Sequence, residues 1–303
     1  MPAPDIRVHE NQPVLVEMLD EVSFRSDVLY TNEKGETNAG VQRRTSKIVR
    51  NLGPGLERIL QPKEVVLYAM PARSPLSVLE QFTATLWTAM LAACVVVVTD
   101  QRILFFPVKR NGKWRESVRA VAWGDLEEVK PIGLLIKNVA FKARDGAKVT
   151  FTNVRSGDGK KIRAITSALL PGAAGEQTSA HGMVQLCPDC SAVLAPGNYE
   201  CPNCGLIFKN EKTMIVRSIL LPGGGYFYTG HPLVAIFPAI VEAIFLLDVV
   251  VILLVGFSSP KAAPELVHGI LILGVFWALE TGITILHCRR FVREFIPLRL
   301  KAR

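Results

Sequence analysis

Two long apolar stretches near the C-terminal end constrain this chain more than any other feature. The first runs from Pro232 to Phe257 and the second from Leu266 to Leu286. A helix needs about 20 apolar residues to cross a bilayer, and each stretch is at least that long. The sequence that joins them, SSPKAAPE, is short and contains two prolines. We therefore predict an α-helical transmembrane hairpin over residues 232–288.

Charges around this hairpin predict its orientation. Basic residues lie on both flanks, whereas the joining sequence contains only one, and the flanking ones are Lys209, Lys212, Arg217, Arg289, Arg290 and Arg293. Such flanks face the cytosol. The N-terminal sequence MPAPDIRVHENQPVL has no basic segment followed by an apolar core, so we expect no signal peptide. The predicted location is the cytoplasmic (inner) membrane, with two spans and both termini in the cytosol.

The last segment, residues 289–303, mixes arginines with Phe, Ile and Leu. Such a segment is predicted to lie on an anionic membrane surface through its basic residues, of which Arg289, Arg290 and Arg293 come first. It accounts for much of the formal net charge of +8. Membrane lipids are therefore the expected partners, and no nucleic acid is expected.

Three acids lie inside the apolar stretches, at Glu242, Asp248 and Glu280. Charges at such depth are costly, so each is a candidate functional residue. In an antiparallel hairpin Glu242 and Glu280 fall at similar depth and would share a proton if they faced each other. Two interpretations stay open: a proton or ion path that includes His287, and the favoured one, in which the acids bond to partner helices or one of them is buried in its protonated form. Small residues at Gly274, Ala278 and Gly282 would allow close helix approach within the hairpin or in a homo-oligomer.

Four cysteines form the second strong signal. Cys187 and Cys190 form one C-x-x-C pair, and Cys201 and Cys204 form another ten residues later. Two such pairs supply the four thiolates of a structural zinc site, so we predict a short zinc ribbon over residues 185–208 that binds one Zn²⁺. Gly205 follows the second pair, where a left-handed backbone is common. The other two cysteines, Cys94 and Cys288, are predicted to be packing residues, Cys288 also being a weak acylation candidate.

Residues 61–170 have a sequence pattern typical of antiparallel strands followed by a helix. The runs VVLYAM, CVVVV and RILFF are β-branched or aromatic, and Asn111-Gly112 and Asp145-Gly146 are hairpin turn signals. The uncharged run from Phe82 to Thr99 reaches the length of a membrane span, but it leads into a hairpin and is predicted to end as a buried strand. The sequence VVVVTDQRILFF, with the later VAWGDLEEV and a closing helix, resembles bacterial PH-like (GRAM-like) domains. That resemblance implies a small antiparallel β-barrel or bent sandwich capped by a C-terminal helix, used for lipid or protein docking.

The segments around this module are less specific. Residues 1–60 are predicted to be a partly helical extension, with a short helix through Met18 and Val22 and a basic cluster around Arg43 and Arg50 on a solvated helix face. Residues 171–184 have linker composition. At the start of the closing helix, Lys160, Lys161 and Arg163 are candidate ligands for an anionic lipid headgroup.

The sequence LLPGGGYFYTGH, from Leu220 to His231, joins the cysteine segment to the hairpin. It lacks the Lys and Ser/Thr of a phosphate-binding loop. Residues 209–231 are predicted to form an interfacial or re-entrant helix and a glycine turn, whose aromatic residues Tyr226, Phe227 and Tyr228 anchor at headgroup depth. The segment 213–257 resembles the L-P-G-x-G-x-x-Y-x-G motif of TM2-like membrane proteins, and the resemblance matches Asp248 to the acid of that family's helix.

The chain thus predicts a multidomain membrane protein with no catalytic constellation of nucleophile, base or open metal site. The favoured function is a non-enzymatic scaffold or adaptor that presents its cytosolic modules to a protein partner or lipid headgroup. Two alternatives remain: an oligomeric ion or proton conductor, or transport-accessory subunit, built on the buried acids, and a sensor of anionic lipid.

Overall fold

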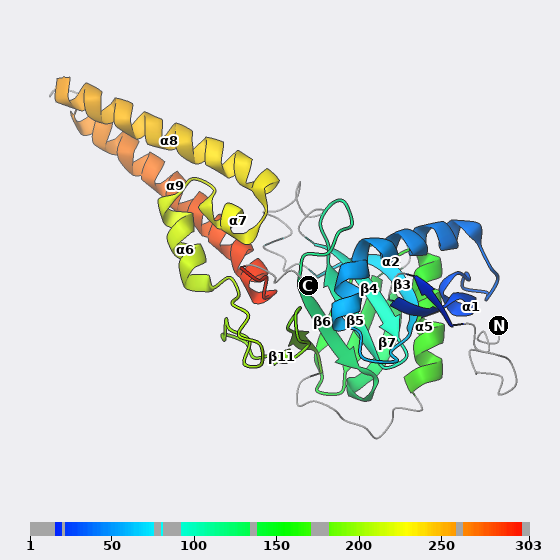
Figure 1. Ribbon diagram of the computed structural model, residues 1–303. Helices are drawn as coiled ribbons and strands as arrows, with labels where there is room; N and C mark the ends of the chain where they lie inside the picture. The colour runs from blue at the N-terminus through cyan, green and yellow to red at the C-terminus, as the bar shows by residue number, and fades with distance from the viewer. Residues whose placement is uncertain are drawn as a thin grey trace, which may run out of the picture. The chain divides into compact units, whose positions relative to one another are not determined.

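The computed structural model describes residues 16–19, 22–75, 80, 92–133, 138–170, 182–258 and 263–298. These residues form two compact units, which divide between Leu206 and Ile207. The first unit is a mixed β-sheet domain that carries the four-cysteine cluster, and the second is helical (Figure 1).

The larger sheet of the first unit has the strand order β1-β2-β3-β4-β5-β6-β10-β11. Its strands are β1 (Val16–Leu19), β2 (Val22–Arg25), β3 (Val66–Arg73), β4 (Ala93–Thr99), β5 (Arg102–Pro107), β6 (Val118–Ala122), β10 (Val184–Leu186) and β11 (Val193–Leu194). Strands β3 to β6 form an antiparallel meander, and β2 joins its edge in parallel to β3. The predicted strands of the VVLYAM, CVVVV and RILFF runs are therefore confirmed.

Strand β4 lies in the middle of this meander, and its valine run is buried on both faces. Val96 and Val98 join one hydrophobic core, whereas Val95 and Val97 join the other. A strand covered on both sides needs apolar residues at every position, which explains why this run shows no polar alternation. The preceding part of the uncharged run, residues 82–91, lies outside the described residues.

The Thr99-Asp100-Gln101 turn between β4 and β5 depends on a buried ion pair. Arg102 donates to both carboxylate oxygens of Glu64, at 3.0 Å and 2.8 Å, and to the carbonyl of Ile59. The Thr99 hydroxyl donates to Glu64 at 2.7 Å and accepts the N–H of Arg102. Thr99 and Arg102, the two buried residues of this TDQR turn, therefore have their polar side chains satisfied by Glu64 inside the protein.

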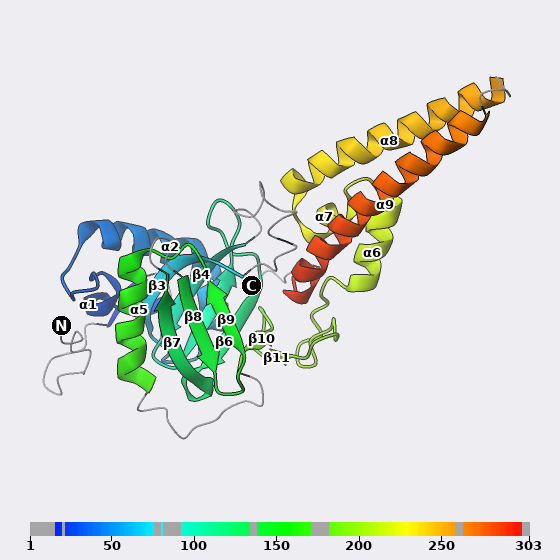
Figure 2. The same cartoon turned by 180° about the vertical axis from the view of Figure 1, so that it is seen from behind.

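A second sheet and a helix cover one face of the meander. The strands are β7 (Leu126–Ile132), β8 (Asn138–Ala143) and β9 (Lys148–Phe151), and the helix is α5 (Ser156–Leu169) (Figure 2). A single bridge between Arg73 and Thr152 links the two sheets. The predicted turns at Gly112 and Gly146 are confirmed, since both glycines have positive φ angles. The predicted barrel, however, is not closed: the strands form two separate sheets.

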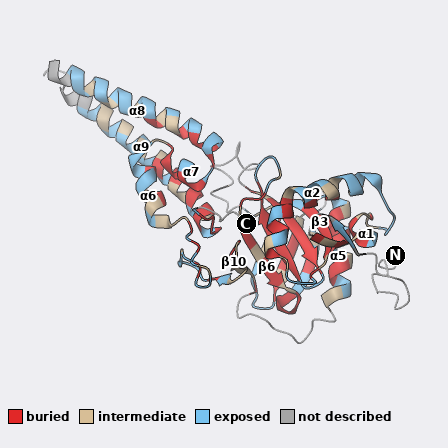
Figure 3. Ribbon diagram, viewed as in Figure 1, coloured by how far each residue is buried: buried red, intermediate tan, exposed pale blue. Residues whose placement is uncertain are grey.

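The opposite face of the meander is covered by α2 (Ala39–Ile59), a helix of the predicted N-terminal extension. Its apolar stripe of Val49, Leu52 and Leu56 is buried against the sheet (Figure 3). Gly55 allows this approach, because a Cβ there would lie 2.8 Å from the Trp114 ring. Residues 22–60 thus share the core of the β-domain. The predicted helix through Met18 and Val22 is wrong, because both residues belong to strands, β1 and β2, preceding the 4-residue helix α1 (Ser26–Leu29).

The segment before the cysteines also belongs to the sheet. Of the predicted linker 171–184, residues 171–181 lie outside the described residues, but Val184 begins β10 and pairs with Ala120 of β6. Leu186, at the end of β10, is buried in the core beneath α2. The cysteine cluster is therefore attached to the β-domain through a shared sheet.

The second unit contains four helices: α6 (Glu211–Leu220), α7 (Gly224–Thr229), α8 (Pro232–Ser258) and α9 (Ala263–Arg293). Helices α8 and α9 are long and apolar enough to cross a membrane, with candidate spans Pro232–Val255 and Val267–Arg293. In the most apolar 18-residue window of each span, 11% of the residues are buried. Helix α6 exposes Val216, Ile219 and Leu220 and buries Met214, which is the two-faced pattern predicted for it.

The residues after α9 fold back on the start of the unit. Phe295 packs edge-on against Phe208 with ring centroids 5.6 Å apart, and the backbone of Ile207–Lys209 bonds to that of Ile296–Leu298. Arg289 pairs with Glu211, and Arg290 lies 3.7 Å from Glu294. Part of the predicted surface tail therefore packs within the unit, because its aromatic and aliphatic residues are buried there. Residues 299–303 lie outside the described residues.

Candidate metal centre and buried carboxyl pair

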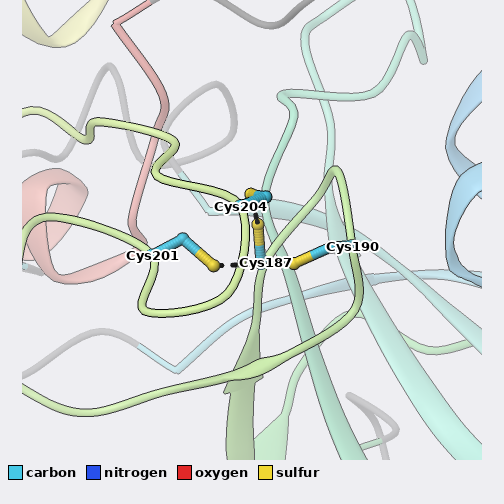
Figure 4. Close-up of side chains that lie close together, drawn as sticks. All are labelled: Cys187, Cys190, Cys201 and Cys204. Atoms are coloured by element: carbon cyan, nitrogen blue, oxygen red, sulfur yellow. Dashed lines mark hydrogen bonds between the residues drawn. The ribbon is translucent and has the colours of Figure 1, made fainter.

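The four cysteines predicted to bind metal converge at one point. Their sulfur atoms all lie within 4.8 Å of one another. The Cys187 and Cys204 sulfurs are 3.6 Å apart, and those of Cys190 and Cys201 are 3.5 Å apart (Figure 4). Tetrahedral Zn–S bonds of about 2.3 Å would place sulfurs roughly 3.8 Å apart, so the cluster has the size of a four-thiolate site. The cluster could therefore hold a metal ion.

The two C-x-x-C pairs are built by the same local structure. In each, the first cysteine's carbonyl accepts a bond from the residue four positions on, Ser191 at 3.0 Å and Gly205 at 3.0 Å. Both of those residues have left-handed backbones, with φ of 59° and 68°. The left-handed conformation predicted at Gly205 is confirmed, whereas Ser191, a less favourable residue for it, was not predicted. This repeated turn directs both pairs of thiols to one centre.

The thiols have unequal tendencies to ionise. Burial raises the pKa of Cys187. Burial also opposes ionisation of Cys190, but hydrogen bonds from Asn203 and the Ala192 amide lower its pKa to about 7. Four thiolates this close would repel one another. A divalent cation that displaces the thiol protons offsets this repulsion with its own positive charge. All four positions are sulfur, so a tetrahedral ion here would have no open position for substrate.

The cluster is fixed to the β-domain on two sides. Its first strand, β10, pairs with β6. On the other side, Arg58 at the end of α2 reaches Asp189 at 3.5 Å, and Ser191 donates its hydroxyl to the Arg58 carbonyl. Both contacts involve residues of the first cysteine pair, so that pair has a defined orientation on the domain.

In the second unit, the structure brings together two of the three predicted acids. Glu242 of α8 is 2% exposed, and its carboxyl lies within hydrogen-bonding reach of Glu280 of α9. Glu242 also accepts the backbone N–H of Gly223 at 3.0 Å, and Glu280 accepts the Thr284 hydroxyl at 2.9 Å. The sequence made a shared proton conditional on Glu242 and Glu280 facing each other, and their carboxyl groups do interact here. The third acid, Asp248, is exposed and lies on another face of α8.

The glycine turn places the backbone N–H of Gly223 within hydrogen-bonding distance of Glu242. Gly223 has a φ of 63°, and a Cβ there would lie 2.6 Å from the Ala235 carbonyl. At Gly224 a Cβ would lie 2.1 Å from the Arg217 carbonyl, and at Gly225 2.2 Å from the Ser218 hydroxyl. The three glycines are therefore required by close packing of α6, α7 and α8, and not by a phosphate.

The aromatic residues of this turn behave differently from the prediction. Only Phe227 is exposed, whereas Tyr226 and Tyr228 are buried. The Tyr226 hydroxyl bonds to the Nδ1 atom of His287, and the Tyr228 hydroxyl accepts the Asn210 N–H. Headgroup anchoring by both tyrosines is therefore wrong: each phenol has a partner inside the unit. Cys288, completely buried beside Thr229, extends this polar cluster, and its burial speaks against acylation.

The predicted headgroup residues at the start of α5 separate in the structure. Lys160 and Arg163 are exposed, but Lys161 is buried, so the prediction is wrong for Lys161. Its ammonium group donates to the carbonyls of Val28 and Thr31 and lies 4.4 Å from the Tyr68 ring centroid. Burial lowers the pKa of Lys161 to about 7. Neighbouring Asp158 accepts bonds from Tyr68 at 2.8 Å and from Arg44 at 2.6 Å.

A cavity of about 680 Å³ lies between α2, the start of β4 and the β5–β6 turn. Its apolar lining includes Ile48, Pro71 and Val95. Its basic lining residues are Arg44, Lys47, Lys109 and Arg110, and no acid is among the described residues that line it. The sequence indicated the basic residues of α2 but not this cavity, because residues of the β5–β6 turn complete it.

Comparisons of the chain with protein-family models, with curated proteins and with solved structures returned no match. The arrangement of the described residues alone therefore carries the functional inference.

Proposed function

We propose that this chain is a non-enzymatic, membrane-anchored adaptor, in which the β-domain and its cysteine cluster form a cytosolic docking platform. The observation that supports this proposal is the construction of the cluster. Its four sulfurs close around one point, and the cluster is fixed to a rigid sheet through β6 and Arg58. A closed site of this kind stabilises a surface but offers no coordination position for catalysis.

Zinc is the proposed metal. Four cysteine ligands in two C-x-x-C turns suit its tetrahedral preference. The proposed resemblance to PH-like domains is supported by the order of a four-stranded meander, a three-stranded sheet and a closing helix. That fold class commonly serves docking, although a fold by itself does not determine function.

Helices α8 and α9 are the proposed membrane anchor, with both ends of the hairpin in the cytosol. The support is the length and apolar surface of both helices, together with basic residues at the two ends of the unit. The resemblance of the glycine turn to TM2-like proteins belongs to this proposal. So does self-association through α9, since Gly274 and Gly282 have open space around them.

Co-purification from native membranes tests the adaptor function. The full chain and a Cys201→Ser variant are expected to reach the membrane in equal amounts, because the hairpin is unchanged. Partner proteins retained by the wild type should be lost with the variant, and metal analysis should fall from about one zinc per chain to none. An identical set of partners with and without the metal would refute the platform role of the cluster.

A second candidate function, sensing of anionic lipid, is favoured by the basic cavity. An apolar pocket rimmed by Lys47, Lys109 and Arg110 suits an acidic headgroup with part of its acyl chain. This location replaces the start of α5, where Lys161 is buried.

Photoactivatable phosphatidylglycerol in nanodiscs with the full chain tests the lipid site. Cross-links are expected on α2 and the β5–β6 turn, and they should weaken in Lys109→Ser but not in the matched control Lys160→Ser. Equal labelling by a phosphatidylcholine probe would show that no acidic headgroup is recognised.

A further inference from the structure

Two carboxyl oxygens between α8 and α9 lack a hydrogen-bond partner. Both are buried, and they are Oε1 of Glu242 and Oε2 of Glu280. Buried polar atoms are almost always paired, because an unpaired one loses its hydration without compensation. These two atoms belong to carboxyl groups that lie within hydrogen-bonding reach of each other. A hydrogen shared by the two carboxyl groups would supply the missing hydrogen-bond partner.

The other two oxygens of the pair are already engaged. Glu242 Oε2 accepts the Gly223 N–H at 3.0 Å, and Glu280 Oε1 accepts the Thr284 hydroxyl at 2.9 Å. One oxygen of each carboxyl therefore accepts a hydrogen bond from a donor of the protein, and its other oxygen has no partner. A hydrogen carried by one of the two carboxyl groups lets that group donate to the other, which two ionised carboxylates cannot do.

Among the described residues, no lysine or arginine forms an ion pair with either acid. The arginines of the unit with known partners are engaged elsewhere, Arg289 with Glu211, Arg290 with Glu294 and Arg217 over the Tyr228 ring. The titratable groups packed nearby are Tyr226 of α7 and His287 and Cys288 of α9. Tyr226 and His287 bond to each other. Two ionised carboxylates in contact on apolar helices would repel with no cation to offset them.

We propose that Glu242 and Glu280 form a proton-binding site, in which one carboxylic acid donates its hydrogen to the neighbouring carboxylate. The bound proton holds α8 against α9. It also holds the glycine turn, because the Gly223 amide is bonded to the same carboxyl. Loss of the proton places two negative charges in contact and drives the helices apart at this level. The inference is independent of the adaptor function, which rests on the cysteine cluster.

Infrared spectroscopy of the full chain in lipid bilayers tests the proposal. A protonated carboxyl band that shifts on isotopic labelling of glutamate is expected at neutral pH. Glu242→Gln and Glu280→Gln should each remove it, because the amide N–H₂ replaces the shared proton and leaves the remaining acid ionised. Glu211→Gln, which changes a partly exposed acid paired with Arg289, should leave the band unchanged.

Amide exchange of the same variants reports on the turn. Glu242→Gln keeps an acceptor for the Gly223 N–H and should preserve protection of residues 223–229, whereas Glu242→Ala should lose it. The proposal is overturned if the wild type has no protonated carboxyl band, or if the band survives both glutamine substitutions. It is also overturned if the band appears only when sodium is replaced by choline, since a metal ion would then occupy the site.

Discussion

Two buried acids of the β-domain, Glu64 and Asp158, are matched by arginines, whereas Glu242 and Glu280 of the helical unit are not. In the β-domain, Arg102 donates hydrogen bonds to both carboxylate oxygens of Glu64. Asp158 accepts hydrogen bonds from Arg44 and Tyr68. In the helical unit, Glu242 faces a second acid and one amide. A matched pair fixes a structure, while two acids that face each other create a site whose charge can change.

The chain therefore contains buried polar groups of two kinds: ion pairs that stabilise the fold, and an acid pair that can bind a proton. The Glu64–Arg102 pair closes a turn and leaves nothing for a ligand to complete. The Glu242–Glu280 pair is complete only with a proton. Lys161 lies between these cases, because it is buried with carbonyl acceptors but without a carboxylate bonded to it. Substitutions in both units can therefore test whether the distinction holds.

The largest effect is expected from Glu64→Gln. The change removes the charge that offsets Arg102, which is buried, and breaking such a pair costs about 3–5 kcal/mol. Amide exchange of β4 and β5 in the full chain should accelerate accordingly. The control is Glu127→Gln, whose pair with Lys142 is exposed and contributes about 0–1 kcal/mol. Equal losses in the two variants would show that the buried pair has no special structural role.

Gly225→Ala should have the next largest effect. A Cβ there would lie 2.2 Å from the Ser218 hydroxyl and 3.1 Å from the Cys288 sulfur, so the Ser218 side chain must rotate and the contact of α7 with α9 must loosen. Overpacking of this kind costs about 1–3 kcal/mol. Thermal unfolding of the full chain in bilayers measures the loss.

The matched control for this variant is Gly282→Ala on α9, where a Cβ meets no atom within 4 Å. It should be neutral or slightly stabilising in a single chain, since alanine favours helix. A destabilised Gly282→Ala variant would instead indicate that this face of α9 is packed against another copy.

A pH-dependent effect is expected at Lys161. Its folded pKa is lowered to about 7 by burial, whereas an unfolded lysine titrates near about 10.4. Between these values the unfolded chain binds more protons, so stability of the β-domain rises with pH, by at most about 1.4 kcal/mol per pH unit. Amide exchange at several pH values, corrected for intrinsic rates, should show this rise in wild type and Lys160→Met but not in Lys161→Met. Parallel pH profiles in all three proteins would contradict it.

The sequence predicted the sites whose residues are close along the chain or related by simple helix geometry. The cysteine spacing identified the cluster, and counting from the hairpin turn placed Glu242 opposite Glu280. It did not predict the partner of Tyr226, because His287 lies 61 residues away and a tyrosine suits a membrane surface equally well. Likewise, the sequence indicated α2 by its basic residues but did not predict that its apolar stripe packs against the sheet, because that contact depends on distant strands.

The smallest effect is expected from Asp248→Asn. Asp248 lies six residues from Glu242, which turns its side chain by about 240° around α8, and it is exposed. Among the described residues it has no partner to lose. Amide exchange of α8 and α9 and the shared-proton infrared band should therefore match wild type. Loss of that band in Asp248→Asn would connect the third acid to the pair and favour a proton path, because only coupled sites respond to one another's charge.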